Sequence, residues 1–384
     1  MDEAAWRLPG PAGFLEKAVD ALVQGVVVLD VPPSRAGAII PSFRRAAEEA
    51  GYASGGFFAL TDDPRVPPAS QIAEAALPAG GRPPTLSAAS IASADGMDGV
   101  VCLVAPRPGA DERLERGGRI DWRRWEPFVS GFLTARAGSR LVDPPSIVFL
   151  APAAAGALDK RAARFRFEGV VGRDEARLVF AGAARGRGPS ELDRLLAVEL
   201  AVELAGWDLA TVRVLAGRSL EELLDLSSHD LSVNRFSRGP LEWANGRAVS
   251  WEDGSVDLFE GRRFAALGAV LATQDAQELE RRIWRAQVRA LFPWLEEVRQ
   301  EFIDRHSRRL RLPLLSYDGT EIDDPADLDW GQIQWAMKGS ATQQEMDWLT
   351  VMKDIRNALA HRRPASFGRL AAAQRDCRRM LSGG

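Results

Sequence analysis

The residues with the clearest chemical potential lie close together near the end of the chain. Arg356, Asn357 and His361 form the pattern R-N-x-x-x-H within the stretch WLTVMKDIRNALAHRRP. A histidine at a helix C-terminus is stabilised as a cation by the helix dipole, which favours a proton donor. The neighbouring Arg362 and Arg363 act in the opposite direction, because nearby positive charges disfavour another cation. The pattern therefore indicates proton-transfer chemistry at the end of a helix.

A helix predicted at Gln343–Ala360 must position this pattern, with Thr342 or Ser340 as its cap. Its expected buried stripe consists of apolar residues at helical spacing: Trp348, Leu349, Met352, Ile355 and Leu359. Two helices are predicted before it, at Glu278–His306 and Asp327–Met337. Together these helices predict an all-α bundle for the C-terminal region. Pro293 is expected to kink the first of them or to split it in two.

The helical period sets a condition on the candidate site. Asn357 and His361 are four residues apart and share a face, whereas Arg356 lies roughly 140° from His361 on an ideal helix. Arg356 and His361 can act together if the helix ends near His361, if the arginine side chain reaches round, or if a second chain supplies its own copy. Pro364 favours an end just after His361. The alternative is that Arg356 pairs with Asp354 or a buried carboxylate while His361 only caps the helix.

The local sequence resembles the HEPN superfamily, a group of helical-bundle domains that includes many RNases of toxin and antiviral systems. Its signature is R-x4–6-H with a polar residue after the arginine, late in a long helix, and Ala360 and Pro364 also match many members. The resemblance implies metal-independent RNA cleavage, in which a 2′-OH attacks the adjacent phosphate. His361 would be the general acid/base, Arg356 would hold the phosphate, and Asn357 would orient the histidine or the phosphate. In the family two such helices usually pair, and many members are binding or assembly modules.

Local charge supports contact with a polyanion in this region. The chain of 384 residues has a net charge of −4, so it has no general attraction to nucleic acid or anionic membrane. The last 40 residues nevertheless hold eight Lys/Arg against four Asp/Glu. We expect RNA contacts from two basic clusters. Their members are Arg362 and Arg363, and Arg305, Arg308 and Arg309.

The first part of the chain, 1–152, alternates between short apolar runs and helical segments. Strands are predicted at Val26–Val31, Val100–Ala105 and Ile147–Ala151. Helices are predicted at Phe14–Val23, Ile39–Ala50, Ser70–Ala76 and Trp122–Ala135. Buried strands that alternate with helices predict a parallel α/β layer. The aromatic residues of the last helix are expected to belong to the core.

The loop after the first strand, DVPPSRAGA, lies where a nucleotide-binding loop would be expected. It has one glycine, no lysine and two prolines that remove N–H donors, so it lacks the groups that hold phosphates. The chain has only four lysines, and none follows a suitable strand. The layout resembles the degenerate NTPase modules of the STAND and AAA class in architecture only. That resemblance implies a scaffold or sensor that no longer hydrolyses ATP, and no bound cofactor.

The middle part, 153–268, is predicted to be mixed. Two strands are expected to pair, at Arg164–Gly169 and Ala176–Ala181. Helices are predicted at Glu191–Ala205, with Ser190 as N-cap, at Asp208–Ala216 and at Leu220–Leu226. Leu241–Phe259 is expected to form a small hairpin or meander with turns at Asn245-Gly246 and Asp253-Gly254. The remainder, 269–384, is the helical bundle.

The composition restricts location and metal chemistry. Cys102 and Cys377 are the only cysteines, too few for a disulfide framework or a cysteine-built zinc site. The start of the chain lacks a signal-peptide pattern, and no apolar run reaches the roughly 18 residues that span a bilayer. We therefore expect a cytoplasmic protein without membrane, metal or cofactor.

Two functions remain open from the sequence. The first is an endoribonuclease effector of a bacterial antiviral or toxin-type system, silent until dimerisation or a partner protein releases it. The second is a non-catalytic regulatory or assembly subunit that binds protein partners through degenerate NTPase-like and HEPN-like domains. The R-N-x-x-x-H pattern favours the first function, and the missing phosphate-loop lysine favours the second.

Overall fold

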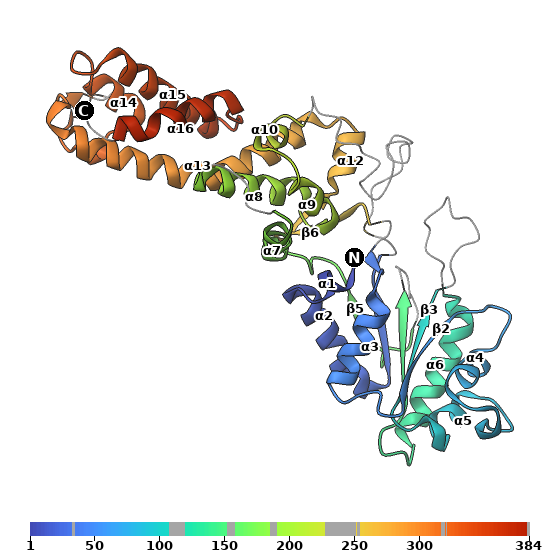
Figure 1. Ribbon diagram of the computed structural model, residues 1–384. Coiled ribbons are helices and arrows are strands. Elements are labelled where there is room, and N and C mark those ends of the chain that lie inside the picture. The colour runs from blue at the N-terminus through green and yellow to red at the C-terminus, as the bar shows by residue number, and fades with distance from the viewer. Residues whose placement is uncertain are drawn as a thin grey trace. The chain divides into compact units, whose positions relative to one another are not determined.

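The computed structural model divides the chain into two compact units (Figure 1). It describes all residues except 33–34, 107–119, 152–157, 185–189, 227–250, 252–253, 316–318, 320 and 382–384. The first unit consists of 1–175 and 246–266, and the second of 176–245 and 267–384. The borders differ from the predicted divisions at 152 and 268, because the sheet of the first unit includes a strand beyond residue 152.

A five-stranded parallel sheet with the order β2-β3-β4-β1-β5 forms the centre of the first unit. The strands are β1 (Val26–Asp30), β2 (Gly56–Thr61), β3 (Val100–Ala105), β4 (Ser146–Ala151) and β5 (Ala163–Arg166). Nearly every residue of β1, β3 and β4 is buried, as in strands covered on both faces. The predicted parallel α/β layer is therefore confirmed. The edge strand β2 is only partly buried and was not predicted.

Helices cover both faces of this sheet (Figure 1). One face carries α1 (Glu3–Trp6), α2 (Pro9–Asp20) and α3 (Ile39–Glu49). The other carries α4 (Pro68–Ala76), α5 (Ala88–Ser93) and α6 (Trp122–Ala137). Trp125 and Phe132 of α6 are fully buried, and Trp125 lies 5.1 Å from Phe149 of β4 between ring centroids. The core role predicted for these aromatic residues is confirmed for Trp125, Phe128 and Phe132, and Trp122 packs against the same cluster while partly buried.

The predicted strand Ala176–Ala181 is wrong, because these residues belong to the helix α7 (Arg173–Ala183). Ala176 and Phe180, four residues apart, are buried, while the residues between them are exposed or partly exposed. That is the burial period of a helix rather than of a strand. β5 therefore pairs with β1 instead of with a second strand from this segment.

A β-hairpin from late in the sequence completes the first unit. β6 (Val256–Phe259) and β7 (Arg262–Ala265) are antiparallel, and Glu260-Gly261 between them has φ of 51° and 73°. Positive φ at both positions is typical of a type I′ turn. The observed turn lies at Glu260-Gly261, whereas Asn245-Gly246 and Asp253, which belong to the two predicted turns, lie outside the described residues.

The second unit is mainly helical. Its helices include α8 (Glu191–Ala205), α9 (Leu209–Leu215), α10 (Leu220–Leu224), α12 (Leu267–Ala272), α13 (Ala276–His306), α14 (Trp330–Ala336), α15 (Gln343–Ala360) and α16 (Phe367–Leu381). Two-residue strands β8 (Leu314–Leu315) and β9 (Glu321–Ile322) form a small antiparallel pair. Of the two alternatives predicted for Pro293, a kink or a split, the split is wrong, since α13 continues through Pro293. Pro293 lies on the exposed side, where the backbone group that it leaves unbonded can face water.

Trp348 of α15 lies at the centre of the C-terminal helices. Its ring is 5.5 Å from Phe302 of α13 and 5.7 Å from Trp330 of α14, and its indole N–H donates to the Ala373 carbonyl of α16 at 3.1 Å. All five residues predicted for the α15 stripe are buried, and Thr342 forms a capping box with Glu345. The helical character of this region is confirmed. No helix among the described residues has both the length and the apolar content of a bilayer span.

Candidate functional site

The helix α15 ends where the R-N-x-x-x-H pattern ends. His361 is the C-cap residue. The Arg363 N–H donates to the Ala358 carbonyl at 2.8 Å, and the Arg362 N–H donates to the Leu359 carbonyl at 3.1 Å. With the left-handed backbone of Arg362, φ 59°, these bonds form a Schellman motif. The sequence condition that the helix stop near His361 is therefore met.

The side chain of Arg356 turns toward Asn357. Both residues are half-buried, and the Arg356 guanidinium donates to the Asn357 side-chain oxygen at 3.3 Å. Successive residues do not face each other on a helix, so this bond requires Arg356 to reach round toward the face that Asn357 shares with His361. Within the described residues Arg356 makes no ion pair with Asp354 or another carboxylate, and no hydrogen bond joins it to His361. His361 is exposed to solvent.

Two side chains of α13 hold the turn that follows the pattern. Gln287 is fully buried; its amide N–H donates to the Ala365 carbonyl at 2.8 Å, and its amide oxygen accepts from the Ala365 N–H at 2.7 Å. The Trp284 indole donates to the Leu359 carbonyl at 2.7 Å. The backbone is thus bonded to α13 on both sides of His361. Neither residue is part of the sequence pattern, although a glutamine four residues from Leu291, on the apolar face of the predicted helix, is a signal of a buried amide.

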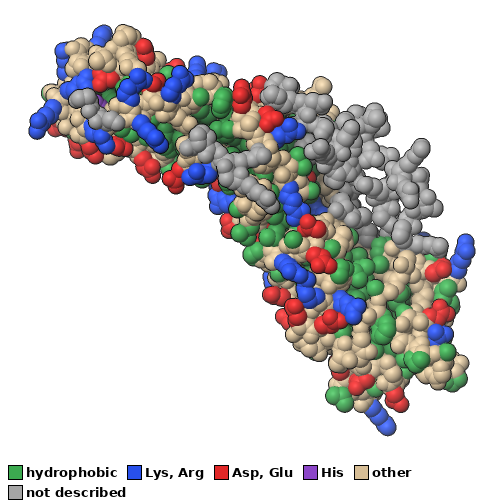
Figure 2. Space-filling model, in the orientation of Figure 1, with side chains coloured by type: hydrophobic (Ala, Val, Ile, Leu, Met, Phe, Trp, Pro, Cys, Tyr) green, Lys and Arg blue, Asp and Glu red, His purple; other side chains and the backbone are tan. Residues whose placement is uncertain are grey.

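The basic residues predicted to contact RNA lie in two separate places. Arg362 and Arg363 follow His361 directly and are exposed. Arg305, by contrast, is eighteen residues beyond Gln287 on α13, about 27 Å along the helix axis. It pairs with Glu301 at 2.6 Å. Arg362 and Arg363 therefore lie at the candidate site, whereas Arg305 lies at the C-terminal end of α13 and Arg308 and Arg309 lie just after it. Figure 2 shows Lys and Arg interspersed with acidic side chains over the C-terminal helices.

Arg309 is part of an internal network. Its guanidinium bonds both carboxylate oxygens of Glu345, at 2.7 and 2.8 Å, and the Ser340 carbonyl at 2.7 Å. This partner lowers the pKa of Glu345 to about 2. Arg309 also donates to Nδ1 of His306 at 3.1 Å, while Nε2 of His306 lies 3.1 Å from the Met380 carbonyl. Arginine only donates and a carbonyl only accepts, so His306 is assigned its proton on Nε2.

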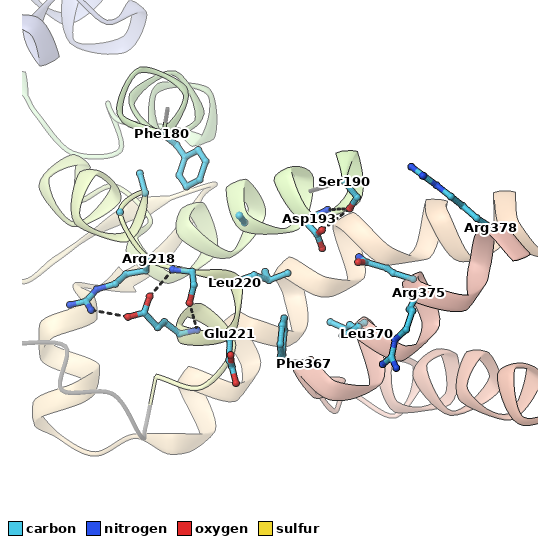
Figure 3. Close-up of a pocket in the computed structure, with 17 residues that line it drawn as sticks. Phe180, Ser190, Asp193, Arg218, Leu220, Glu221, Phe367, Leu370, Arg375 and Arg378 are labelled. Carbon is cyan, nitrogen blue, oxygen red and sulfur yellow. Dashed lines mark hydrogen bonds and ion pairs between the residues drawn. The ribbon is translucent and has the colours of Figure 1, made fainter. Parts of the chain in front are cut away.

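A groove of about 940 Å³ lies beside α16 (Figure 3). Apolar side chains of α10 and α16, Leu220, Phe367 and Leu370, gather in it. The groove also contains an acidic residue of α10, Glu221, and a basic residue of α16, Arg375. A volume of this order is typical of ligand sites. Phe367, the first residue of α16, lines the groove and follows Ala365, which Gln287 bonds, by two residues.

The loop that follows the carboxyl end of β1 is bonded to other residues of the first unit. Arg35, in the loop after β1, forms a buried ion pair with Asp257 of the β6–β7 hairpin. The same carboxylate accepts from the Gly169 N–H at 2.9 Å. The Trp6 indole donates to the Gly37 carbonyl at 2.8 Å. The described part of this loop is therefore bonded to the hairpin and to α1, while positions 33 and 34 lie outside the described residues.

Neither metal-ligand groups nor comparison with known proteins assigns a function to the chain. In the part of the chain that the structure describes, no three His, Cys, Asp or Glu side chains are grouped as a metal ion would require. No family model, no curated protein and no solved structure matches the chain. Function is therefore argued from the geometry of the chain's own residues.

Proposed function

We propose that the second unit is a HEPN-like domain that cleaves RNA without a metal ion, as part of a bacterial antiviral or toxin-type system in the cytoplasm. The observation that carries this proposal is the end of α15 at His361, with Arg356 turned toward Asn357. The exposed imidazole, the half-buried guanidinium and the two arginines that follow are the groups that the reaction needs.

The reaction assigns a role to each side chain. The substrate 2′-oxygen attacks phosphorus, a bond forms between them, and the bond from phosphorus to the 5′-oxygen breaks. His361 accepts the 2′ proton as a base; as imidazolium, it or the imidazole of a second copy then gives a proton to the leaving 5′-oxygen. Arg356 holds the phosphate and stabilises its developing charge. Asn357 orients Arg356, and Arg362 and Arg363 bind neighbouring phosphates.

The experiment compares wild type with Arg356→Ala, His361→Ala and Arg308→Ala on single-stranded RNA in the presence of EDTA. We expect wild type and Arg308→Ala to cleave, because Arg308 lies in the cluster at the other end of α13. We expect at least a 100-fold lower rate for the other two variants. Host toxicity should follow the same order. Equal behaviour of all four proteins would remove the nuclease proposal.

The second candidate function is a non-catalytic regulatory or assembly subunit. Two observations favour it: the loop after β1 is occupied by the Arg35–Asp257 ion pair and by Trp6, and the groove beside α16 offers a surface for a partner protein. The first unit would then be a degenerate STAND/AAA-type module that keeps its sheet without binding nucleotide. Calorimetry with ATP and Mg²⁺ tests this function; we expect no heat of binding, and saturable binding would contradict it.

A further inference from the structure

We infer that Gln287 and Trp284 are positioning residues: they hold the turn 361–366 in the backbone conformation that presents His361 and Arg362 to a phosphate. This inference rests on the proposed function for its chemical purpose. That Gln287 and Trp284 determine the conformation of the turn does not depend on whether the chain cleaves RNA.

The backbone of the turn is unfavourable for the residue that occupies it. Arg362 has φ 59°, a left-handed conformation that residues with a Cβ rarely adopt and that a helix C-terminus usually assigns to glycine. Such a conformation persists only where the surroundings determine it. Arginine at this position therefore implies both a restraint on the backbone and a use for its side chain.

The restraint comes from α13. Gln287 bonds both the N–H and the carbonyl of Ala365, and Trp284 bonds the Leu359 carbonyl, so the segment between Leu359 and Ala365 is fixed at both ends. Gln287 is fully buried, where an amide is costly unless each of its groups is paired. An apolar side chain would fill the same position without that requirement. The buried amide therefore serves to specify the backbone of the turn.

The side chains that this restraint presents are cationic and exposed. His361, Arg362 and Arg363 are all open to solvent, and none has a side-chain hydrogen bond or ion pair with another described residue. Two arginine side chains that contact only water do not require a fixed backbone conformation. A phosphate held beside an imidazole does, because a displacement of about 1 Å of a catalytic group costs up to ~100-fold in rate.

Trp348 offers a matched control in the same bundle. Its indole also donates to a backbone carbonyl, that of Ala373, at 3.1 Å, and the residue is buried. Trp348 lies on α15 eleven residues before Leu359, about 17 Å along the helix axis. Trp348→Phe and Trp284→Phe therefore remove the same kind of bond, but only Trp284→Phe removes one from the Leu359 carbonyl, which also accepts from the Arg362 N–H of the turn.

The experiment measures RNA cleavage kinetics and amide hydrogen exchange for Trp284→Phe, Gln287→Met and Trp348→Phe. For the first two variants we expect kcat to fall about tenfold or more while KM changes less than about threefold. Exchange across 361–366 should accelerate about tenfold or more. Trp348→Phe should leave both quantities within about twofold at a similar shift of the unfolding midpoint. Equal effects of Trp284→Phe and Trp348→Phe on kcat and on turn exchange would overturn the inference.

A second variant separates restraint from general destabilisation. Arg362→Gly removes the unfavourable conformation, so the double variant Gln287→Met/Arg362→Gly should regain most of the slow exchange that Gln287→Met loses. If exchange stays fast in the double variant, Gln287 does not act by restraining this turn. Exchange does not depend on catalysis: a wild type that fails to cleave RNA would end the proposed function, while the exchange measurements would still decide the role of Gln287.

Discussion

The Arg356 guanidinium donates a 3.3 Å hydrogen bond to the side-chain oxygen of Asn357, its neighbour in sequence. On a regular helix these two side chains diverge by about 100°, so the bond shows that Arg356 bends toward the face on which His361 follows. The helix then ends at His361, and the turn beyond it is bonded to α13 at Ala365 by Gln287. These features make one end of α15 the place where cleavage chemistry would occur.

Binding of RNA should depend more on Arg362 and Arg363, which follow His361, than on the cluster that contains Arg305 and Arg308. Arg362→Glu/Arg363→Glu reverses charges beside His361, so we expect RNA affinity to fall at least about tenfold and the salt dependence to weaken. Arg305→Glu/Arg308→Glu is the matched variant, with the same change of charge about 27 Å away along α13. Fluorescence anisotropy at several salt concentrations measures both. Equal losses would show that the site extends over the whole bundle.

Arg362→Gly should stabilise the protein while it weakens RNA binding. Glycine adopts φ near +59° without a steric penalty, so the free energy of unfolding should rise by about 0.5–1 kcal/mol. Loss of the cation should lower RNA affinity. The control is Arg363→Gly, at a position with ordinary φ, where we expect no gain in stability. Urea unfolding tests the prediction, and a loss of stability with Arg362→Gly would contradict it.

The Glu345–Arg309 pair should make stability depend on pH in the acid range. The Arg309 hydrogen bonds lower the pKa of Glu345 from 4.5 to about 2 in the folded state. Its stabilising contribution is therefore fully present above pH 4.5 and disappears as pH falls toward 2. Glu345→Gln should cost about 1.5–3 kcal/mol at pH 7 and progressively less below pH 4.5.

Urea unfolding of wild type and of Glu345→Gln at pH 7 and at pH 2.5 measures how the cost of this substitution depends on pH. Glu297→Gln serves as the control, since Glu297 is exposed and has no partner among the described residues. Its effect should be small at both pH values. A difference between wild type and Glu345→Gln that stays constant down to pH 2.5 would mean that Arg309 does not act through this carboxylate.

Two glycines of α2 should respond in opposite ways to alanine. A Cβ at Gly10 would overlap the carbonyl oxygen of Val170, so Gly10→Ala should lower the free energy of unfolding by about 1–3 kcal/mol. A Cβ at Gly13 meets no atom within 4 Å, and alanine is the better helix former, so Gly13→Ala should raise it by about 0.5–1 kcal/mol. Thermal unfolding measures both variants. A stabilising Gly10→Ala would contradict the packing of α2 against Val170.

The local sequence pattern was sufficient to predict the elements whose structure depends only on which residues are buried. The apolar run of β1 and the five-residue stripe of α15 are read directly from periodicity. The local pattern was insufficient where packing against segments distant in the sequence determines the structure. The run at Ala176–Ala181 has strand-like composition, but its burial period is set by packing as α7. The pairing of Gln287 with Ala365 joins residues 78 apart, a relationship that no short pattern contains.

The most direct test of the central claim is the analysis of RNA products formed by the purified chain in excess EDTA. Wild type should leave 2′,3′-cyclic phosphate and 5′-hydroxyl ends, and His361→Ala should form these products at least about 100-fold more slowly while it keeps its RNA affinity. Cleavage that EDTA abolishes, or that persists at the wild-type rate in His361→Ala, would contradict the account.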